Sequence, residues 1–184
     1  MFIRTERLLL RPGWIEDAPA LAAAISDESI LTKLALAPSP YRLADAVTFL
    51  SMPRDERSAD FLMFQRANGA PRLIGGVGLM TRDDETELGY WIARPYWGLG
   101  FATEAARAVV DLARHSLRHR ALVSGHFIDN PASGNVLVKL GFRATGQIVA
   151  RESRARGVAV PCKLYALDLD KDEPRVEMPQ AMAA

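Results

Sequence analysis

The sequence predicts a mixed α/β fold, with helices packed on a central twisted sheet that contains both parallel and antiparallel strands. A strand, a long helix and a second strand follow one another between residues 87 and 127, and this order produces a parallel strand pair. Strand patterns joined by short turns stand on both sides of that unit, and short turns join antiparallel strands. The predicted sheet is therefore mixed.

The amino-terminal third reads as one strand followed by helices. Residues 2–11 are apolar enough for a strand. Asp17 is the expected N-cap of a helix that tolerates Pro19 in its first turn and ends at about Ile25. A loop is expected over residues 35–40, and a short second helix is marked by an apolar stripe of Leu43, Val47 and Leu50.

A hairpin is predicted next, with strands over residues 61–67 and 72–80 around Asn68-Gly69. After a solvated turn at residues 83–85, a strand is expected over residues 87–93. A long helix follows over residues 102–117, with small and aliphatic side chains on one face: Ala102, Ala105, Ala106, Val109, Val110, Ala113 and Leu117.

The last third predicts a strand over residues 121–127 and a helix over residues 132–140 that Gly141 ends. Residues 142–151 and 158–169 read as an antiparallel pair around the turn at residues 155–157.

Length and composition indicate one globular domain over residues 1–170, with residues 171–184 as a flexible polar tail. The net charge of +1 argues against nucleic-acid binding by bulk charge. Cys162 is the only cysteine, which excludes an intramolecular disulfide and fits a reducing cytoplasm. We find no membrane span and no signal-peptide pattern, so we expect a cytoplasmic protein. A homodimer is compatible with the sequence.

The most informative segment is a glycine loop between a strand and a helix, at residues 90–104. Gly98 and Gly100 allow a tight turn and a close approach of backbone to ligand. The helix that follows directs its unpaired N–H groups into the loop, a geometry that binds phosphate. The loop lacks the Gly-Lys-Ser/Thr of a P-loop, and Thr103 stands where a dinucleotide fingerprint has its third glycine.

Two other segments give this loop a context: residues 130–142, which read as a loop, helix and turn, and Thr5-Glu6-Arg7-Leu8 at the start. Together the three segments resemble the GNAT superfamily of acyl-CoA-dependent N-acyltransferases, and the opening resembles its ribosomal-protein N-acetyltransferase branch. The resemblance covers residues 5–170. It implies the GNAT fold, in which a parallel strand pair splays apart at the acyl-CoA site.

The resemblance also implies how acetyl-CoA is held, as a cosubstrate and without a metal. Main-chain groups would pair with the pantetheine arm at Tyr90, Trp91, Ile92 and Ala93. N–H groups would cradle the pyrophosphate at Gly98, Leu99, Gly100, Phe101, Ala102 and Thr103. Asn130 would bond to the pantetheine amides, or else serve only as an Asn-Pro turn residue. The chain departs from the family at Pro95, where a basic or amide residue is common.

Glu87 is the candidate general base, because a partly desolvated carboxylate at the head of a strand can take the proton of an amine. The alternative is a surface glutamate after an acidic turn. Glu104 and His126 are rival candidates, although Glu104 also suits the first turn of a helix and a lone histidine is more often structural.

Ser133 is the candidate general acid by resemblance. Many family members protonate the leaving thiolate with a tyrosine, but the matching position here is Leu137. In the ribosomal-protein branch a serine one turn earlier is the suggested replacement, and Ser133 matches it. The alternative for Ser133 is a helix cap.

The sequence therefore predicts an acetyl-CoA-dependent N-acetyltransferase that transfers the acetyl group directly to a primary amine. A protein N-terminal α-amine is the acceptor suggested by the branch. The alternatives are a small-molecule amine, such as an antibiotic or a polyamine, and a non-catalytic acyl-CoA-binding module. His115 and His119 have no partners of metal-site type, so no metal is expected.

Overall fold

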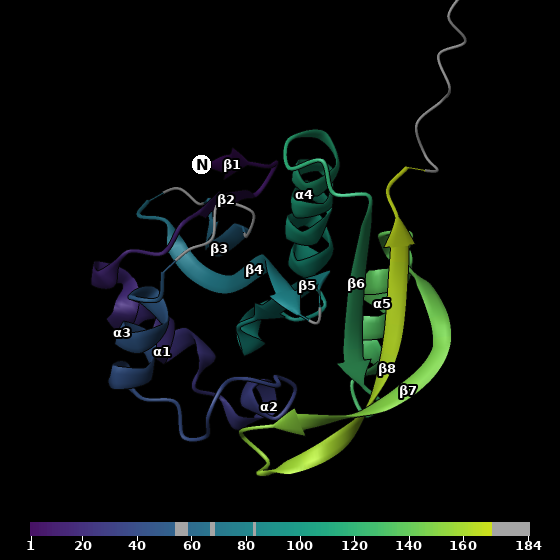
Figure 1. The fold of residues 1–184 in the computed structure, drawn as a ribbon. Coiled ribbons are helices and arrows are strands. Elements are labelled where there is room, and N and C mark those ends of the chain that lie inside the picture. Colours follow the sequence, from purple (N-terminus) through teal and green to yellow (C-terminus); the bar gives the residue numbers. More distant parts are fainter. Residues whose placement is uncertain (54–58, 67–68, 83, 171–184) are drawn as a thin grey trace, which may run out of the picture.

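The chain folds around one eight-stranded mixed sheet with helices on both faces (Figure 1). The computed structural model describes residues 1–53, 59–66, 69–82 and 84–170. The strands stand in the order β1-β2-β3-β4-β5-β6-β8-β7. Their bounds are β1 Ile3–Arg4, β2 Leu8–Arg11, β3 Ala59–Gln65, β4 Arg72–Arg82, β5 Glu85–Ile92, β6 Ala121–Phe127, β7 Arg143–Ser153 and β8 Val158–Asp168.

The sheet consists of two antiparallel halves, β1 to β5 and β6-β8-β7, joined by the parallel pair β5–β6. In the described residues this junction is a single paired position, Glu87 opposite Val123. The Ser124 hydroxyl extends it by donating to the Leu88 carbonyl at 2.8 Å. Beyond that bond the two strands diverge, which confirms the mixed sheet with a splayed parallel pair.

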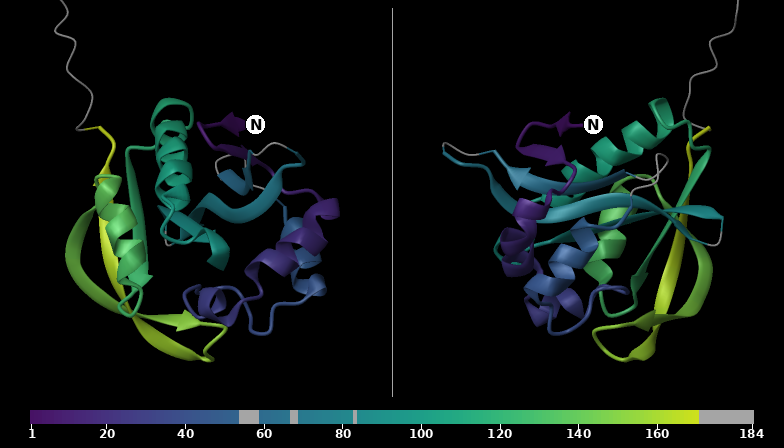
Figure 2. Two further views of the ribbon diagram at one scale, coloured as in Figure 1. Left: turned by 180° about the vertical axis from the view of Figure 1, so that it is seen from behind. Right: turned by 60° about the vertical axis from the view of Figure 1, so that its left-hand side comes forward.

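The helices divide between the two faces of the sheet (Figure 2). The long helix α4 (Phe101–His115) and α5 (Pro131–Lys139) cover one face, and α1 (Ala18–Ile25) and α3 (Leu43–Leu50) cover the other. Strand β3 shows the division, because Met63 packs under α4 while Leu62 and Phe64 pack with α1. None of the helices in the described residues is long and apolar enough to cross a membrane.

The amino-terminal segment differs from the prediction of one strand over residues 2–11. It folds back on itself, so that β1 and β2 pair with Ile3 opposite Leu10. Thr5 makes the turn, since the Leu8 N–H donates to Thr5 Oγ1 at 3.0 Å and the Thr5 N–H donates to the Leu8 carbonyl. A polar residue with local hydrogen-bonding capacity thus interrupts an otherwise apolar strand pattern.

Asp17 is the N-cap of α1 as predicted, but its side chain makes no cap hydrogen bond, because its carboxylate binds the Arg11 guanidinium and the Trp14 N–H. The apolar stripe predicted on α3 meets the core only at Leu50. Ala46 is fully buried there, whereas Leu43 is 52% exposed and Val47 is 39% exposed.

A short helix that the sequence did not predict, α2 (Glu28–Leu31), follows α1. Asp27 is its N-cap and accepts from the Ser29 N–H at 2.8 Å. Four residues are too few to carry a helical period, which is why pattern analysis missed it.

The remaining elements match their predicted ends to within two residues. The buried face of α4 is the predicted one, from Ala105 to Ala113. Gly141, at φ 91°, ends α5 in the left-handed conformation. The hairpin β3–β4 is present, but its predicted Asn68 lies outside the described residues, as do Asp83 of the predicted turn and the predicted tail at residues 171–184.

Candidate active site at the splayed strands

The gap between β5 and β6 is edged by main-chain groups of β5. Backbone groups of successive strand residues point to opposite edges. The Leu88 carbonyl faces β6, and the Ala93 N–H faces β4, where it donates to the Ile74 carbonyl at 2.8 Å. Tyr90 and the Ile92 N–H therefore face the gap, whereas the Ile92 carbonyl accepts a hydrogen bond from the Trp97 indole N–H at 2.7 Å. The Ala93 N–H, predicted to contact pantetheine, is engaged inside the sheet instead.

The glycine loop leads from β5 to α4 in a conformation that needs glycine. Gly98 has φ 76° and Gly100, the N-cap of α4, has φ 83°. A Cβ on Gly98 would meet nothing within 4 Å, so that side of the loop is open. Phe101, Ala102 and Thr103 are the first helical residues, and their N–H groups have no acceptor within the helix. The loop thus offers exposed backbone and a helix N-terminus to an anion.

Arg7 lies against this loop, and sequence reasoning missed it. Its guanidinium donates to the Leu99 carbonyl at 3.0 Å and stacks on the Phe101 ring at 4.4 Å. Arg7 Nη2 is 3.5 Å from the position that a Cβ of Gly100 would take. A basic group therefore does stand at the loop, although it comes from the β1–β2 turn and not from the position of Pro95. Only a contact across more than 90 residues reveals it.

Glu104 fixes Arg7 in that place. Its carboxylate accepts from the Thr5 hydroxyl at 2.6 Å, and from the Arg7 N–H at 2.8 Å and the Arg7 Nε at 2.7 Å. Partial burial alone would raise the pKa of Glu104, but these hydrogen bonds and the Arg7 charge hold that pKa below its usual value. This carboxylate accepts three hydrogen bonds and holds the first turn of α4 against the β1–β2 turn, which is a structural role.

Glu87 is buried at the closed end of the gap, with 7% of its surface exposed. The Arg82 Nε donates to one carboxylate oxygen at 2.7 Å, and the Arg151 guanidinium donates to the other. The predicted alternative of a surface glutamate is thus excluded by its burial. Each carboxylate oxygen keeps a second lone pair that can accept a further proton or water.

Ser133 lies in the first turn of α5 and does not cap it. The N-cap is Asn130, and Ser133 Oγ lies 2.9 Å from the hydroxyl of Tyr90 on β5. Leu137 is fully buried in the main core. Asn130 makes no side-chain cap hydrogen bond, and its N–H donates to the Phe127 carbonyl at 2.8 Å in the turn that leads into α5.

His126 is a structural residue. Its Nδ1 lies 2.8 Å from the Phe127 carbonyl, its Nε2 lies 3.4 Å from the Tyr165 hydroxyl, and the side chain is 9% exposed. The ring packs against Gly134 of α5, where a Cβ would approach Nε2 to 2.6 Å. These contacts give the ring a packing and hydrogen-bonding role between β6, β8 and α5.

The far end of the gap is bounded by α2 and the turn of the β7–β8 hairpin, which lie together in Figure 1. The Arg154 N–H donates to the Ala35 carbonyl at 2.9 Å. Arg156 donates to the Thr32 carbonyl and to Asp129, both at 2.8 Å. Arg154 and Arg156 therefore tie the hairpin to the segment that follows α2 and to Asp129.

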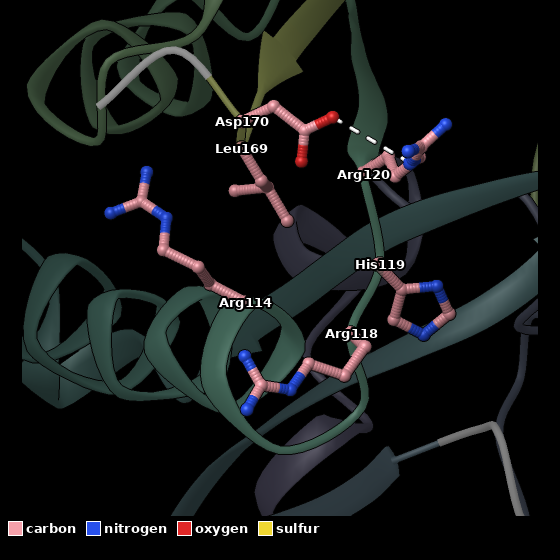
Figure 3. Close-up of a pocket in the computed structure, with 6 residues that line it drawn as sticks. All are labelled: Arg114, Arg118, His119, Arg120, Leu169 and Asp170. Atoms are coloured by element: carbon pink, nitrogen blue, oxygen red, sulfur yellow. Dashed lines mark ion pairs between the residues drawn. The ribbon is translucent and has the colours of Figure 1, made fainter. Parts of the chain in front are cut away.

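A second hollow lies at the opposite end of α4 and is lined by Arg114, Arg118, His119, Arg120, Leu169 and Asp170 (Figure 3). Arg120 pairs there with Asp170 at 3.7 Å. Cations beside a helix C-terminus interact favourably with its dipole, so this cluster has a structural reason. Across the described ranges, no three His, Cys, Asp or Glu side chains are grouped to hold a metal ion.

Comparison with known families agrees with this geometry. A family model described as "Acetyltransferase (GNAT) domain" matches residues 7–143, from Arg7 to the start of β7. The chain belongs to the GNAT acetyltransferase family. The match includes the glycine loop, Glu87 and Ser133, and leaves out the β7–β8 hairpin. The protein is accordingly an acyltransferase by family.

Other GNAT proteins resemble this one over nearly their whole length. The uncharacterised N-acetyltransferase YoaA of Bacillus subtilis is 28% identical over 151 residues, which cover 78% of this chain and 84% of YoaA. A GNAT acetyltransferase of Bacillus anthracis superposes with a TM-score of 0.77 at 21% identity, covering 92% and 99% of the two chains. RimL, the ribosomal L7/L12 α-N-protein acetyltransferase solved with CoA, gives 0.76 at 18% identity, covering 94% and 100%.

Proposed function

We propose that the protein transfers an acetyl group from acetyl-CoA directly to a primary amine, with a protein N-terminal α-amine as the acceptor. The observation that carries the proposal is the splayed β5–β6 pair with the glycine loop at the head of α4 beside it. The gap has the main-chain groups of Tyr90 and the Ile92 N–H for the amides of an extended arm, and the loop offers N–H groups for a diphosphate.

Cofactor binding in this proposal uses mainly backbone. The pantetheine arm of acetyl-CoA pairs with β5, and Asn130, whose amide makes no cap bond, bonds to it from the other side. The pyrophosphate lies on the N–H groups from Gly98 to Thr103. Arg7 supplies the positive charge that Pro95 does not, and the hollow between Arg7, Arg107 and Lys139 has room for the nucleotide end.

In the proposed reaction the amine nitrogen attacks the thioester carbonyl and forms the new C–N bond as the C–S bond breaks. Glu87 accepts the proton of the amine, directly or through water, and Ser133 donates to the departing thiolate. An α-amine has a pKa of about 7.7–8.0 and loses its proton more easily than a lysine, at about 10.4. The similarity to RimL supports the choice of α-amine.

The test is an acceptor screen with acetyl-CoA, in which free thiol is detected. The panel contains peptides with free α-amines, the same peptides with blocked α-amines, polyamines and aminoglycosides. Thiol release with free peptides alone supports the proposal. Release with small amines alone makes the protein a small-molecule acetyltransferase. Calorimetric binding of acetyl-CoA without release from any amine makes it a binding module, and no binding overturns the proposal entirely.

A further inference from the structure

The Tyr90 side chain bridges the gap between the two halves of the sheet. Its hydroxyl lies 2.9 Å from Ser133 Oγ and 2.9 Å from the Ser133 carbonyl oxygen. Together with the bond from Ser124 to Leu88, this contact ties β5 to the β6–α5 unit. The contact between Tyr90 and Ser133 Oγ differs from the Ser124–Leu88 bond because it joins two hydroxyl groups, each of which can either donate or accept.

The pair has two proton arrangements for one set of heavy-atom positions. When the phenol donates to the Ser133 carbonyl, the Ser133 hydroxyl donates back to the phenol oxygen and its hydrogen points at Tyr90. When the phenol donates to Ser133 Oγ, the Ser133 hydrogen is released to point at another acceptor. The orientation of the Ser133 hydroxyl therefore depends on Tyr90.

We propose that Tyr90 is a positioning residue for Ser133: with acyl-CoA bound, its hydroxyl donates to Ser133 Oγ and directs the Ser133 hydrogen at the thioester sulfur. The inference rests on the proposed function, because it assigns no role to the pair without an acyl-CoA in the gap. No proton leaves Tyr90, so the step is a change of hydrogen-bond direction.

The environment of Tyr90 favours positioning over acid catalysis. Burial raises the pKa of Tyr90 to about 12, and the hydrogen bond with Ser133 opposes that rise only in part. The phenol therefore stays protonated throughout the neutral range and is a constant hydrogen-bond donor.

The core on the other side of α5 supports the same conclusion. Leu137 is fully buried in the main core cluster and is surrounded by apolar side chains. No hydroxyl can therefore act from that helix position. Tyr90 brings one to the first turn of α5 from the strand side.

The experiment is a double-mutant cycle with Tyr90→Phe, Ser133→Ala and the double variant. For each protein, kcat is measured at saturating acetyl-CoA with the fastest amine of the acceptor screen, and acetyl-CoA affinity is measured by calorimetry. Tyr41→Phe is the matched control, because burial also raises the pKa of Tyr41 to about 12 and it lies away from α5. Thermal unfolding checks that each variant is folded.

We expect each single variant to lose about tenfold in kcat, the double variant to lose no more, and acetyl-CoA affinity to stay within about twofold. The pH–rate profile of Tyr90→Phe should run parallel to that of the wild type, since an orienting phenol adds no titration. Additive losses, a changed profile, or a Tyr90→Phe kcat at the wild-type level would overturn the inference.

If Tyr90→Phe is unfolded, Ser133→Thr decides: it keeps a hydroxyl and must retain activity that Ser133→Ala loses. A wild type that neither binds acetyl-CoA nor releases thiol refutes the proposed function itself.

Discussion

Glu104 and Arg7 are joined by two hydrogen bonds across 97 positions of the chain, from the Arg7 N–H at 2.8 Å and from Arg7 Nε at 2.7 Å. The same carboxylate binds the Thr5 hydroxyl. The first turn of α4 is thereby fastened to the β1–β2 turn, directly beside the glycine loop. This clasp gives the opening Thr5-Glu6-Arg7 motif a physical role.

The clasp predicts a pH-dependent loss of stability in Glu104→Gln. Because the folded-state pKa of Glu104 lies below the ordinary 4.5, its contribution is fully present above pH 4.5 and is lost as pH falls through the lowered pKa. Urea denaturation at pH 7 should show a loss of about 1–2 kcal/mol. The loss should disappear in acid. Glu6→Gln, a neighbouring exposed glutamate, is the control, and equal losses in both variants would contradict the clasp.

Gly100→Ala should weaken acetyl-CoA binding by at least about tenfold, or about 1.4 kcal/mol. The added Cβ forces an L-residue to φ 83°, at a cost of about 1–2 kcal/mol in stability, and changes the backbone that meets the phosphate. Gly146→Ala is the matched control, because Gly146 has a similar φ of 85°, lies on β7, and has no atom within 4 Å of the position that a Cβ would take. It should lose stability but not affinity. Equal calorimetric affinities for both variants would show that the loop does not hold the cofactor.

Glu87→Gln should lower kcat/KM for the amine by about a hundredfold or more near neutral pH. The deficit should shrink as pH rises, because more of the amine is already neutral. Thermal unfolding must accompany the kinetics, since the variant leaves two guanidinium groups without their shared carboxylate. Glu85→Gln, two residues earlier and exposed, should behave as wild type. If the Glu87→Gln rate profile runs parallel to the wild type at a similar rate, Glu87 is only the partner of Arg82 and Arg151.

Gly134→Ala should destabilise the fold by about 1–3 kcal/mol, although alanine is the better helix former. The new Cβ would come within 2.6 Å of His126 Nε2, and that ring is held by the Phe127 carbonyl and by Tyr165. Asn135→Ala, the exposed next residue, should be neutral or slightly stabilising. A gain in the free energy of unfolding for Gly134→Ala would mean that the imidazole moves aside freely.

Periodic elements could be predicted from the sequence because their signals are local. The buried face of α4, the hairpin pairing and the glycines at positive φ at 98, 100 and 141 all follow from residues close together in the chain. The position of Glu87 at the parallel junction also followed, since it begins the strand before the glycine loop.

Partners distant in sequence could not be predicted. Arg151 is 64 positions from Glu87, and Ser133 is 43 positions from Tyr90, so no local pattern connects them. The prediction of which α3 side chains are buried was wrong for another reason, because pattern analysis assigns large apolar side chains to the core. The small Ala46 is the buried residue there, in a cluster with Ala18 and Leu21 of α1, because small side chains let two helices approach closely.

The single paired position between β5 and β6 has a mechanical consequence. The two halves of the sheet are paired there at one position, and the Glu87–Arg151 ion pair also connects them, since Glu87 lies on β5 and Arg151 lies on β7. A ligand arm that pairs along β5 would occupy the place of a strand between the two halves and couple them. Binding of this ligand should therefore slow amide hydrogen exchange in both β5 and β6, including residues far from those in contact with the ligand.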